Sequence, residues 1–414
     1  MKITRWTLNS IFGLKVAAPA LGLGPWTFFS VILFLVGTVA FWIGISGPRS
    51  ERVWQVFLVN YLFWSGLAFG SVLFSAALIL TKARWGRPIK RLAEAPAAFL
   101  PFSFLLFWVL FAGRDKIFPW IHEPLPLKAA WLNINFLFAR DGLCLFLLTV
   151  ASLALVYFSL RGEREIHFEK DGTLNSYQDQ GGKNLRRQSI LSPILAILFV
   201  LGFSLIGFDL VMSLSPHWYS TLFGMYFFTG AFYSSLAFLF LLSILLVKTL
   251  NLENFVRERQ YHDLGKLLLG FCLMTGDFFF SQFLVIWYGN LPEETRFVIL
   301  RINSAPWKYL AWTVLILSFA VPFAVLLSRK AKMKRGVMLA VTGTILIGMW
   351  LERFLLVAPS LWKGRDLPLG FSEFLISLGF LGLMSLSLLW FFKRFPSLPI
   401  SDPLFQEILE ESRG

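Results

Sequence analysis

Long apolar runs alternate with short polar connections along most of the chain. Ten of these runs reach roughly 20 residues, the length that an α-helix needs to cross the hydrocarbon core of a bilayer. The runs cover 26–46, 54–80, 96–113, 131–160, 191–213, 220–249, 262–288, 305–328, 336–357 and 370–393. This pattern predicts an all-α polytopic membrane protein with ten transmembrane helices.

The polar stretches divide the chain around this membrane domain. We expect an N-terminal segment over 1–25, a transmembrane domain over 26–393 and a C-terminal tail over 394–414. The connection 161–190 is the one long loop, and its polar composition predicts mobility. The N-terminus lacks the cleavage pattern of a signal peptide, so we expect the first helix to be retained.

Composition and charge support the membrane assignment and suggest an orientation. The chain is 57% hydrophobic and only 15% charged, which is too apolar for a soluble domain. Its net charge of +14 does not indicate nucleic-acid binding, because the basic residues lie in short connections between apolar runs. The termini and the connections on their side carry 26 Lys and Arg, against ten in the opposite connections. The positive-inside rule then places both termini in the cytoplasm.

A few ionisable residues interrupt the predicted spans. Each costs roughly 2.5–3.5 kcal/mol on insertion scales, so each needs a partner or a function. Asp277 is the deepest acid, and we expect it and Asp209 to face the interior of the helix bundle. Neighbouring residues on a helix do not face each other, so Arg140 and Asp141 should find partners on other helices. Other candidates for a proton path are His217, His262, Asp263, Glu352 and Tyr226.

These acids allow two interpretations. Asp277 at mid-membrane, the acids nearer the outer face and the His262–Asp263 pair at the inner face could form two half-paths for protons. A buried carboxylic acid can hold and release a proton near neutral pH. Alternatively, the acids pair with Arg140, Arg353 and backbone groups and only stabilise the bundle.

The chain offers no ligand set for a metal. Its two cysteines both fall inside predicted spans, and none of its four histidines occupies the middle of one. Haem and zinc sites need several such ligands on facing elements. We therefore expect no redox centre, catalytic residue or metal on this chain.

The segment 281–295, SQFLVIWYGNLPEET, ends the seventh run in unusual detail. Trp287 and Tyr288 are the aromatics that favour a membrane–water interface, and Pro292 cannot continue the helix. Gln282 lies just below this edge. The three polar or aromatic side chains, Gln282, Trp287 and Tyr288, are candidates for a quinone site.

Four segments resemble one known family. They are KAAWLNINFLFAR at 128–140, FDLVMSLSPHWYSTLFGMY at 208–226, HDLGKLLLGF at 262–271 and WYGNLPEET at 287–295. These segments resemble the membrane subunits of alternative complex III, a quinol:cytochrome c oxidoreductase, within the NrfD-like superfamily of polysulfide reductase membrane subunits. The likeness covers roughly 54–360 and is greatest to the F subunits, which are called quinone-binding subunit 2.

The resemblance implies an architecture and a setting. Two four-helix bundles, about 54–213 and 220–357, would be flanked by the first and last spans. The chain would lie in a bacterial inner membrane, within lipid, beside an NrfD-like sister subunit, an iron–sulfur protein and cytochrome c subunits. Haem c and iron–sulfur clusters would belong to those partners. The F subunit would bind quinone or conduct protons in respiratory or photosynthetic electron transport. The Arg140-Asp141-Gly142 sequence departs from the family pattern, as do 161–190 and the first 25 residues.

Two other functions remain open. The chain could be the catalytic quinol-binding subunit of the same or a related iron–sulfur enzyme, which a neighbouring iron–sulfur subunit at its outer face would favour. It could instead be a secondary transporter, although such proteins often break matched helices in their two halves near the midplane. Pro322 is the one deep proline found in these spans.

Overall fold

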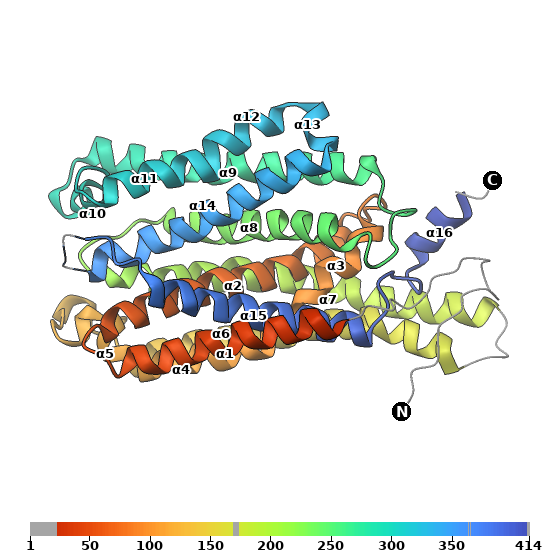
Figure 1. Ribbon diagram of the computed structural model, residues 1–414, viewed down its shortest axis with the longest axis horizontal. Coiled ribbons are helices and arrows are strands. Elements are labelled where there is room, and N and C mark those ends of the chain that lie inside the picture. Colours follow the sequence, from red (N-terminus) through yellow and green to blue (C-terminus); the bar gives the residue numbers. More distant parts are fainter. Residues whose placement is uncertain (1–22, 169–173, 363, 365, 412–414) are drawn as a thin grey trace.

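The computed structural model describes residues 23–168, 174–362, 364 and 366–411. Every regular element in this part of the chain is helical, and ten helices or helix combinations are long and apolar enough to cross a membrane. The fold is therefore the predicted all-α polytopic membrane protein. Helix α16 (Pro403–Glu411) lies at one end of the molecule, here called the terminal end, and α5 and α10 lie at the opposite end (Figure 1).

The ten spans follow the apolar runs closely. They are α1 (Leu23–Ile45), α2 (Ser50–Leu80), the third span, α6 (Ile134–Phe168), α7 (Leu174–Leu210), α8 (Phe223–Leu246), α9 (Glu258–Gly289), the eighth span, α14 (Arg335–Leu361) and α15 (Phe371–Arg394). The third consists of η2 (Arg87–Ile89), α3 (Lys90–Glu94), η3 (Ala95–Phe99) and α4 (Leu100–Ala112). The eighth consists of α11 (Trp307–Leu315), η7 (Ile316–Ala320) and α12 (Val321–Leu327).

Shorter helices connect these spans. They are α5 (Arg114–Ile117), η4 (Pro119–Ile121), η5 (Pro126–Lys128), η6 (Met212–Leu214), α10 (Pro292–Ile302), α13 (Arg329–Met333) and α16 (Pro403–Glu411). The predicted stop after Tyr288 is confirmed, because Asn290 adopts a left-handed conformation directly after α9. The short helix α10, which begins at Pro292, was not predicted.

Two sequence boundaries were wrong. The expected loop 161–190 is largely helical, because α6 runs on to Phe168 and α7 begins at Leu174. A polar helix can extend past the bilayer when water forms hydrogen bonds with its side chains. Helices α6 and α7 therefore continue beyond the ends of their apolar runs. The third span also begins at Arg87 rather than at residue 96, and its first two turns carry charged side chains.

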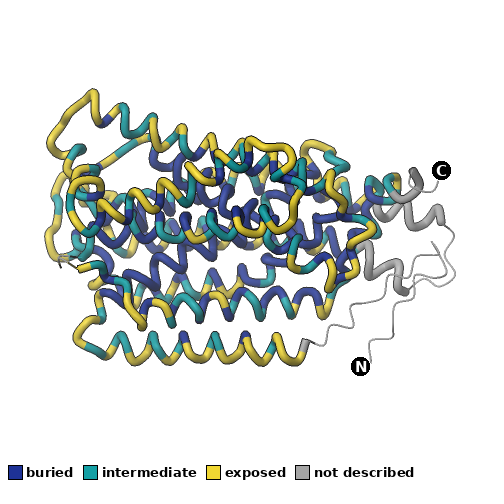
Figure 2. The backbone as a smooth tube through the Cα atoms, turned by 45° about the horizontal axis from the view of Figure 1, so that its top comes forward, coloured by how far each residue is buried: buried dark blue, intermediate teal, exposed yellow. Residues whose placement is uncertain are grey.

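The spans pack in two groups around a buried centre. The first helix group consists of α2, α3–α4, α6 and α7, and the second consists of α8, α9, α11–α12 and α14. Helix α2 also contacts α8, α14 and α15, and 89% of its most apolar stretch is buried (Figure 2). Polar contacts fix this centre: Arg52 Nε lies 2.7 Å from Glu373 Oε1, and Asn60 binds both Ser377 and Trp350.

Helices α1 and α15 pack together along one side of the molecule. A Cβ atom built on Gly379 would come within 2.9 Å of the Cα atom of Gly37, so the two backbones touch directly. Small residues allow such approach between membrane helices, where dispersion replaces the hydrophobic effect. Only 11% of the most apolar stretch of α1 is buried, so α15 is its principal neighbour.

The second helix group is the more open of the two. Only 17% of the most apolar stretch of α9 and 22% of that of α11–α12 are buried. The corresponding fraction is 50% for both α6 and α7. The outer faces of α9 and α11–α12 therefore meet either lipid or another protein.

Candidate functional site

An arginine–carboxylate pair joins the first helix group near the opposite end of the molecule. Arg140 lies near the start of α6 and Asp209 is the penultimate residue of α7, so the antiparallel helices bring them together. Arg140 Nε donates to Asp209 Oδ2 at 2.6 Å, and Nη2 donates to Oδ1 at 2.7 Å. Trp131 Nε1 also donates to Asp209 Oδ1 at 2.9 Å, and its ring lies 3.9 Å from the Arg140 guanidinium. Asp209 is fully buried, so its expected interior position is confirmed.

Asp141 adds a second carboxyl group to this site. Its side chain is fully buried, and neither oxygen accepts a hydrogen bond from a donor in the described residues, although the carboxyl group lies within hydrogen-bonding reach of Asp209. It lies close enough to Asp209 and Arg140 for direct electrostatic interaction. One guanidinium can balance only one of the two carboxylates, and an isolated buried charge is very costly. A proton held by the two acids together would balance the charge.

Hydroxyl groups continue this polar region into the first helix group. Tyr61 on α2 is buried and interacts electrostatically with Asp141. The hydroxyl groups of Ser65 and Ser103 lie 2.7 Å apart and are also buried. We call Arg140, Asp141, Asp209 and Tyr61 the first acid site. Its groups can bind and pass protons.

A second buried acid lies in the second helix group. Tyr226 near the start of α8 donates its hydroxyl proton to Glu352 Oε1 at 2.6 Å. Arg353 Nη1 lies 3.3 Å from Glu352 Oε2, and Arg353 Nη2 donates to the Phe227 carbonyl at 3.2 Å. All three polar side chains are buried. We call Tyr226, Glu352 and Arg353 the second acid site, in which one cation faces one carboxylate.

Phe227 of α8 packs against both α7 and the second acid site. A Cβ atom on Gly207, two residues before Asp209, would lie 3.0 Å from the Phe227 ring. The Arg353 guanidinium lies 4.0 Å from the centre of the same ring. Helix α7 and the second acid site therefore both contact Phe227, which is fully buried.

Asp277 does not join either site, and its predicted interior position was wrong. Its side chain is exposed on α9 and has no hydrogen bond or ion pair with a described residue. Neighbouring residues Met274 and Phe280 are 41% and 59% exposed. The sequence could not reveal this, because a membrane helix that is apolar on all sides does not indicate which face is inward.

The candidate quinone residues do not form an enclosed pocket. Trp287 and Tyr288 are 63% and 78% exposed at the end of α9, as expected for aromatics at a membrane interface. Gln282 is half-buried, and its Oε1 atom has no hydrogen-bond partner in the described chain. Their role in quinone binding stays a prediction.

The histidine candidates lie at the surface, away from both acid sites. His217 is exposed in the connection between α7 and α8. His262 Nδ1 is 3.7 Å from Asp263 Oδ1, which also accepts from Lys266 Nζ at 2.8 Å. Helix α9 begins at Glu258, so His262 lies in its second turn rather than at its start.

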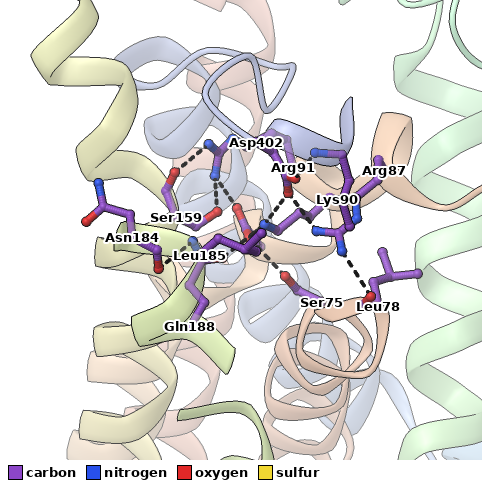
Figure 3. Close-up of polar contacts among 12 residues, drawn as sticks. Ser75, Leu78, Arg87, Lys90, Arg91, Ser159, Asn184, Leu185, Gln188 and Asp402 are labelled. Carbon is purple, nitrogen blue, oxygen red and sulfur yellow. Dashed lines mark hydrogen bonds and ion pairs between the residues drawn. The ribbon is translucent and has the colours of Figure 1, made fainter. Parts of the chain in front are cut away.

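Sequence reasoning missed a buried charge cluster at the terminal end (Figure 3). Asp402, just before α16, accepts from Arg87 Nη1 at 2.6 Å and from Lys90 Nζ at 3.0 Å. Arg91 binds Glu94 and the Ser159 hydroxyl. The cluster thus connects the third span to α6 and to the C-terminal tail. From the sequence alone, its basic residues resemble those of an ordinary cytoplasmic loop. The one acid among them, Glu94, was the only sequence sign of ion pairing.

Two cavities lie near this terminal end. One, of about 10 Å³, is lined by polar residues that include Lys90, Gln188 and Asp402, and has room for about one water. The other, of about 180 Å³, is an apolar cleft between η3, α6 and α15, with Arg161 at its edge. Among the described residues, no three His, Cys, Asp or Glu side chains lie close enough to bind a metal ion.

Comparison with known proteins gives one match. The family model described as "Polysulphide reductase, NrfD" matches residues 44–363, which include both acid sites and nine of the ten spans at least in part. A search of the curated proteins found no match.

Proposed function

Because the chain belongs to the polysulphide reductase NrfD family, we propose that it is the membrane subunit of a quinol-oxidising complex and that its buried acids carry protons. The finer proposal is an F-type subunit of alternative complex III, a quinol:cytochrome c oxidoreductase of a bacterial inner membrane. The likeness of 208–226 and 262–295 to those subunits supports it. An iron–sulfur protein, an NrfD-like sister subunit and cytochrome c subunits would then supply the redox centres and electron acceptors.

The observation that carries this proposal is the buried Asp141. Two carboxyl groups share one guanidinium in the first acid site, and neither Asp141 oxygen accepts a hydrogen bond from a donor in the described residues, although Asp141 and Asp209 lie within hydrogen-bonding reach of each other. A group that only fixed the fold would be expected to have partners, because an unpaired buried polar atom costs about 1–3 kcal/mol. A proton shared between Asp141 and Asp209 would supply both the missing hydrogen bond and the missing charge balance, which makes Asp141 a candidate proton carrier.

The geometry gives each residue of the first acid site a task. Asp141 would hold the mobile proton, and Tyr61 would exchange it through its hydroxyl group. Arg140 would keep Asp209 ionised through its two hydrogen bonds, so that the proton stays on Asp141. The second acid site in the other helix group would be a further group able to accept a proton.

The test is proton movement by the intact complex in liposomes. Asp141→Asn keeps the shape of the side chain but cannot release a proton. We expect normal assembly, partial retention of quinol:cytochrome c activity and at least a tenfold loss of coupled proton movement. The matched control is Asp115→Asn, the same change at an exposed acid of α5, which should alter neither quantity.

Two outcomes would contradict parts of the proposed function. If Asp141→Asn assembles and moves protons at the wild-type rate, the first acid site is structural. If the variant instead loses quinol oxidation itself, the catalytic quinol-binding alternative replaces the supporting role. A photoreactive quinone that labels α9 near Gln282 would separately test the proposed quinone site.

A further inference from the structure

Asp277 occupies a position that the isolated chain does not explain. It precedes Trp287 by ten residues, which is about 15 Å along an α-helix. The hydrocarbon core is about 30 Å thick, and Trp287 with Tyr288 marks one of its edges. Asp277 therefore lies near the middle of the membrane, on the exposed face of a helix that is mostly unburied.

A carboxyl group cannot remain at this depth against lipid without cost. Insertion scales put the cost at roughly 2.5–3.5 kcal/mol at the helix centre, and acids at such positions almost always have partners. The two arginines within the spans are both engaged. Arg140 binds Asp209 in the first acid site, and Arg353 binds Glu352 and a carbonyl group in the second.

The surface around Asp277 suits a second helix. Gly270 lies two turns away on the same face, and a Cβ atom there would meet nothing within 4 Å. Ser281 lies one turn beyond Asp277 on this face and is only half-buried. Small residues at such intervals let another helix approach closely, and polar groups then form contacts across the interface. Leu273 and Phe280 provide apolar contact area around the acid.

We propose that this face of α9 is the docking surface for a membrane-spanning helix of another protein, which places a lysine or arginine opposite Asp277 at mid-membrane. The face consists of Gly270, Leu273, Met274, Asp277, Phe280 and Ser281. A basic partner follows from charge complementarity, because its positive charge and the negative charge of Asp277 would neutralise each other. A second copy of this chain is disfavoured, since its Arg140 and Arg353 are already bound to acids. The proposal does not depend on the reaction proposed above.

Site-specific photocrosslinking in the intact complex tests the docking surface. A photoreactive phenylalanine analogue would replace Phe280, which is 59% exposed on this face. The matched control places the same analogue at Leu201 of α7, which is 63% exposed. We expect Phe280, but not Leu201, to capture one membrane protein, and we expect the captured transmembrane segment to contain a lysine or arginine.

Charge variants test the pairing itself. Asp277→Leu should fold, since it replaces an exposed polar group by an apolar one within a membrane, and the elution profile of the purified chain checks this. We expect its recovery with the captured partner to fall at least tenfold after detergent extraction. Asp277→Lys should lower this recovery in the same way. Changing the partner's basic residue to aspartate should restore recovery with the Asp277→Lys variant.

The outcomes are distinguishable. Capture of lipid alone at Phe280, capture of a second copy of this chain, or wild-type recovery of all partners with Asp277→Leu would each overturn the proposal. Unaltered proton movement in the Asp141→Asn variant would overturn the proposed function and leave the docking surface intact.

Discussion

The buried position of Asp402 makes the attachment of the C-terminal tail testable. Its Oδ2 atom accepts from Arg87 Nη1 at 2.6 Å and from Lys90 Nζ at 3.0 Å, and its Oδ1 atom accepts from the Leu404 amide at 3.1 Å. The Asp402 side chain is only 4% exposed. The change Asp402→Asn would leave two buried cations facing a neutral amide, whereas the buried Phe405 would keep its apolar contact with Phe255.

The expected size of the effect follows from burial. Removing one member of a buried ion pair costs about 3–5 kcal/mol, because the remaining charge is left uncompensated. The tail offers a matched control in Glu407, which lies 3.7 Å from Arg84 with both side chains at least 42% exposed. An exposed pair contributes about 0–1 kcal/mol, so Glu407→Gln should have little effect.

Hydrogen exchange of the α16 amides measures the attachment directly, since exchange reports the free energy of local opening. With about 1.4 kcal/mol for each factor of ten, Asp402→Asn should accelerate exchange of α16 by more than a hundredfold. Glu407→Gln should change it by less than about fivefold. Equal exchange in the two variants would refute the claim that the buried cluster anchors the tail.

The pH dependence gives a second check on the same cluster. Burial alone would raise the pKa of Asp402, but Lys90 and Arg87 outweigh it and hold the pKa below its ordinary value. The stabilisation is therefore complete above the unfolded pKa of about 4 and is lost as the pH falls through the lower folded pKa. Exchange of α16 should show no dependence on ionisation of Asp402 between pH 5 and 8, after correction for the intrinsic exchange rate. An opening transition of α16 between pH 6 and 8 would contradict this assignment.

Three further changes test other parts of the structure. Asp209→Asn should destabilise the purified protein by about 1.5–3 kcal/mol in denaturant unfolding, because it removes the charge from the acceptor of the two Arg140 hydrogen bonds. Tyr226→Phe should cost about 1.5–3 kcal/mol in the same assay, since it removes a hydrogen bond to a buried carboxylate; a smaller effect would argue for a water in its place. Gly379→Val should cost about 1–3 kcal/mol and weaken a disulfide trap engineered between α1 and α15, because it inserts atoms where the backbone meets Gly37; an undiminished trap would show that the helices can adjust.

The spans were predictable because bilayer crossing imposes one strong requirement on sequence. Each span must form its backbone hydrogen bonds within its own helix and needs about 20 apolar residues. Such runs can be recognised in the sequence without knowledge of the neighbouring helices. The pairing of Arg140 with Asp209 was also accessible in outline, since a buried charge demands a neighbour. Both residues of that pair lie near helix ends that antiparallel packing brings together.

Other features depend on contacts that a linear pattern does not encode. The exposed position of Asp277 depends on which side of α9 meets α8, and a uniformly apolar helix gives no sign of that side. The burial of Arg87 and Lys90 depends on Asp402, more than 300 residues later in the chain. The sequence of a basic connection does not show whether an acidic residue from a distant segment will bury it or whether it will remain in water.

The close packing of α1 against α15 has a consequence for biosynthesis. Helix α1 is the first span to leave the ribosome, and α15 is the last, about 330 residues later. At about 5–20 residues per second, roughly a quarter of a minute to a minute passes before the partner of α1 exists. During that time Gly37 faces lipid or an insertion factor, and the open groove it leaves is a recognisable sign of an unfinished chain. This backbone contact can therefore close only after α15 has been made, and a product that ends before α15 would keep α1 loose and open to membrane proteases.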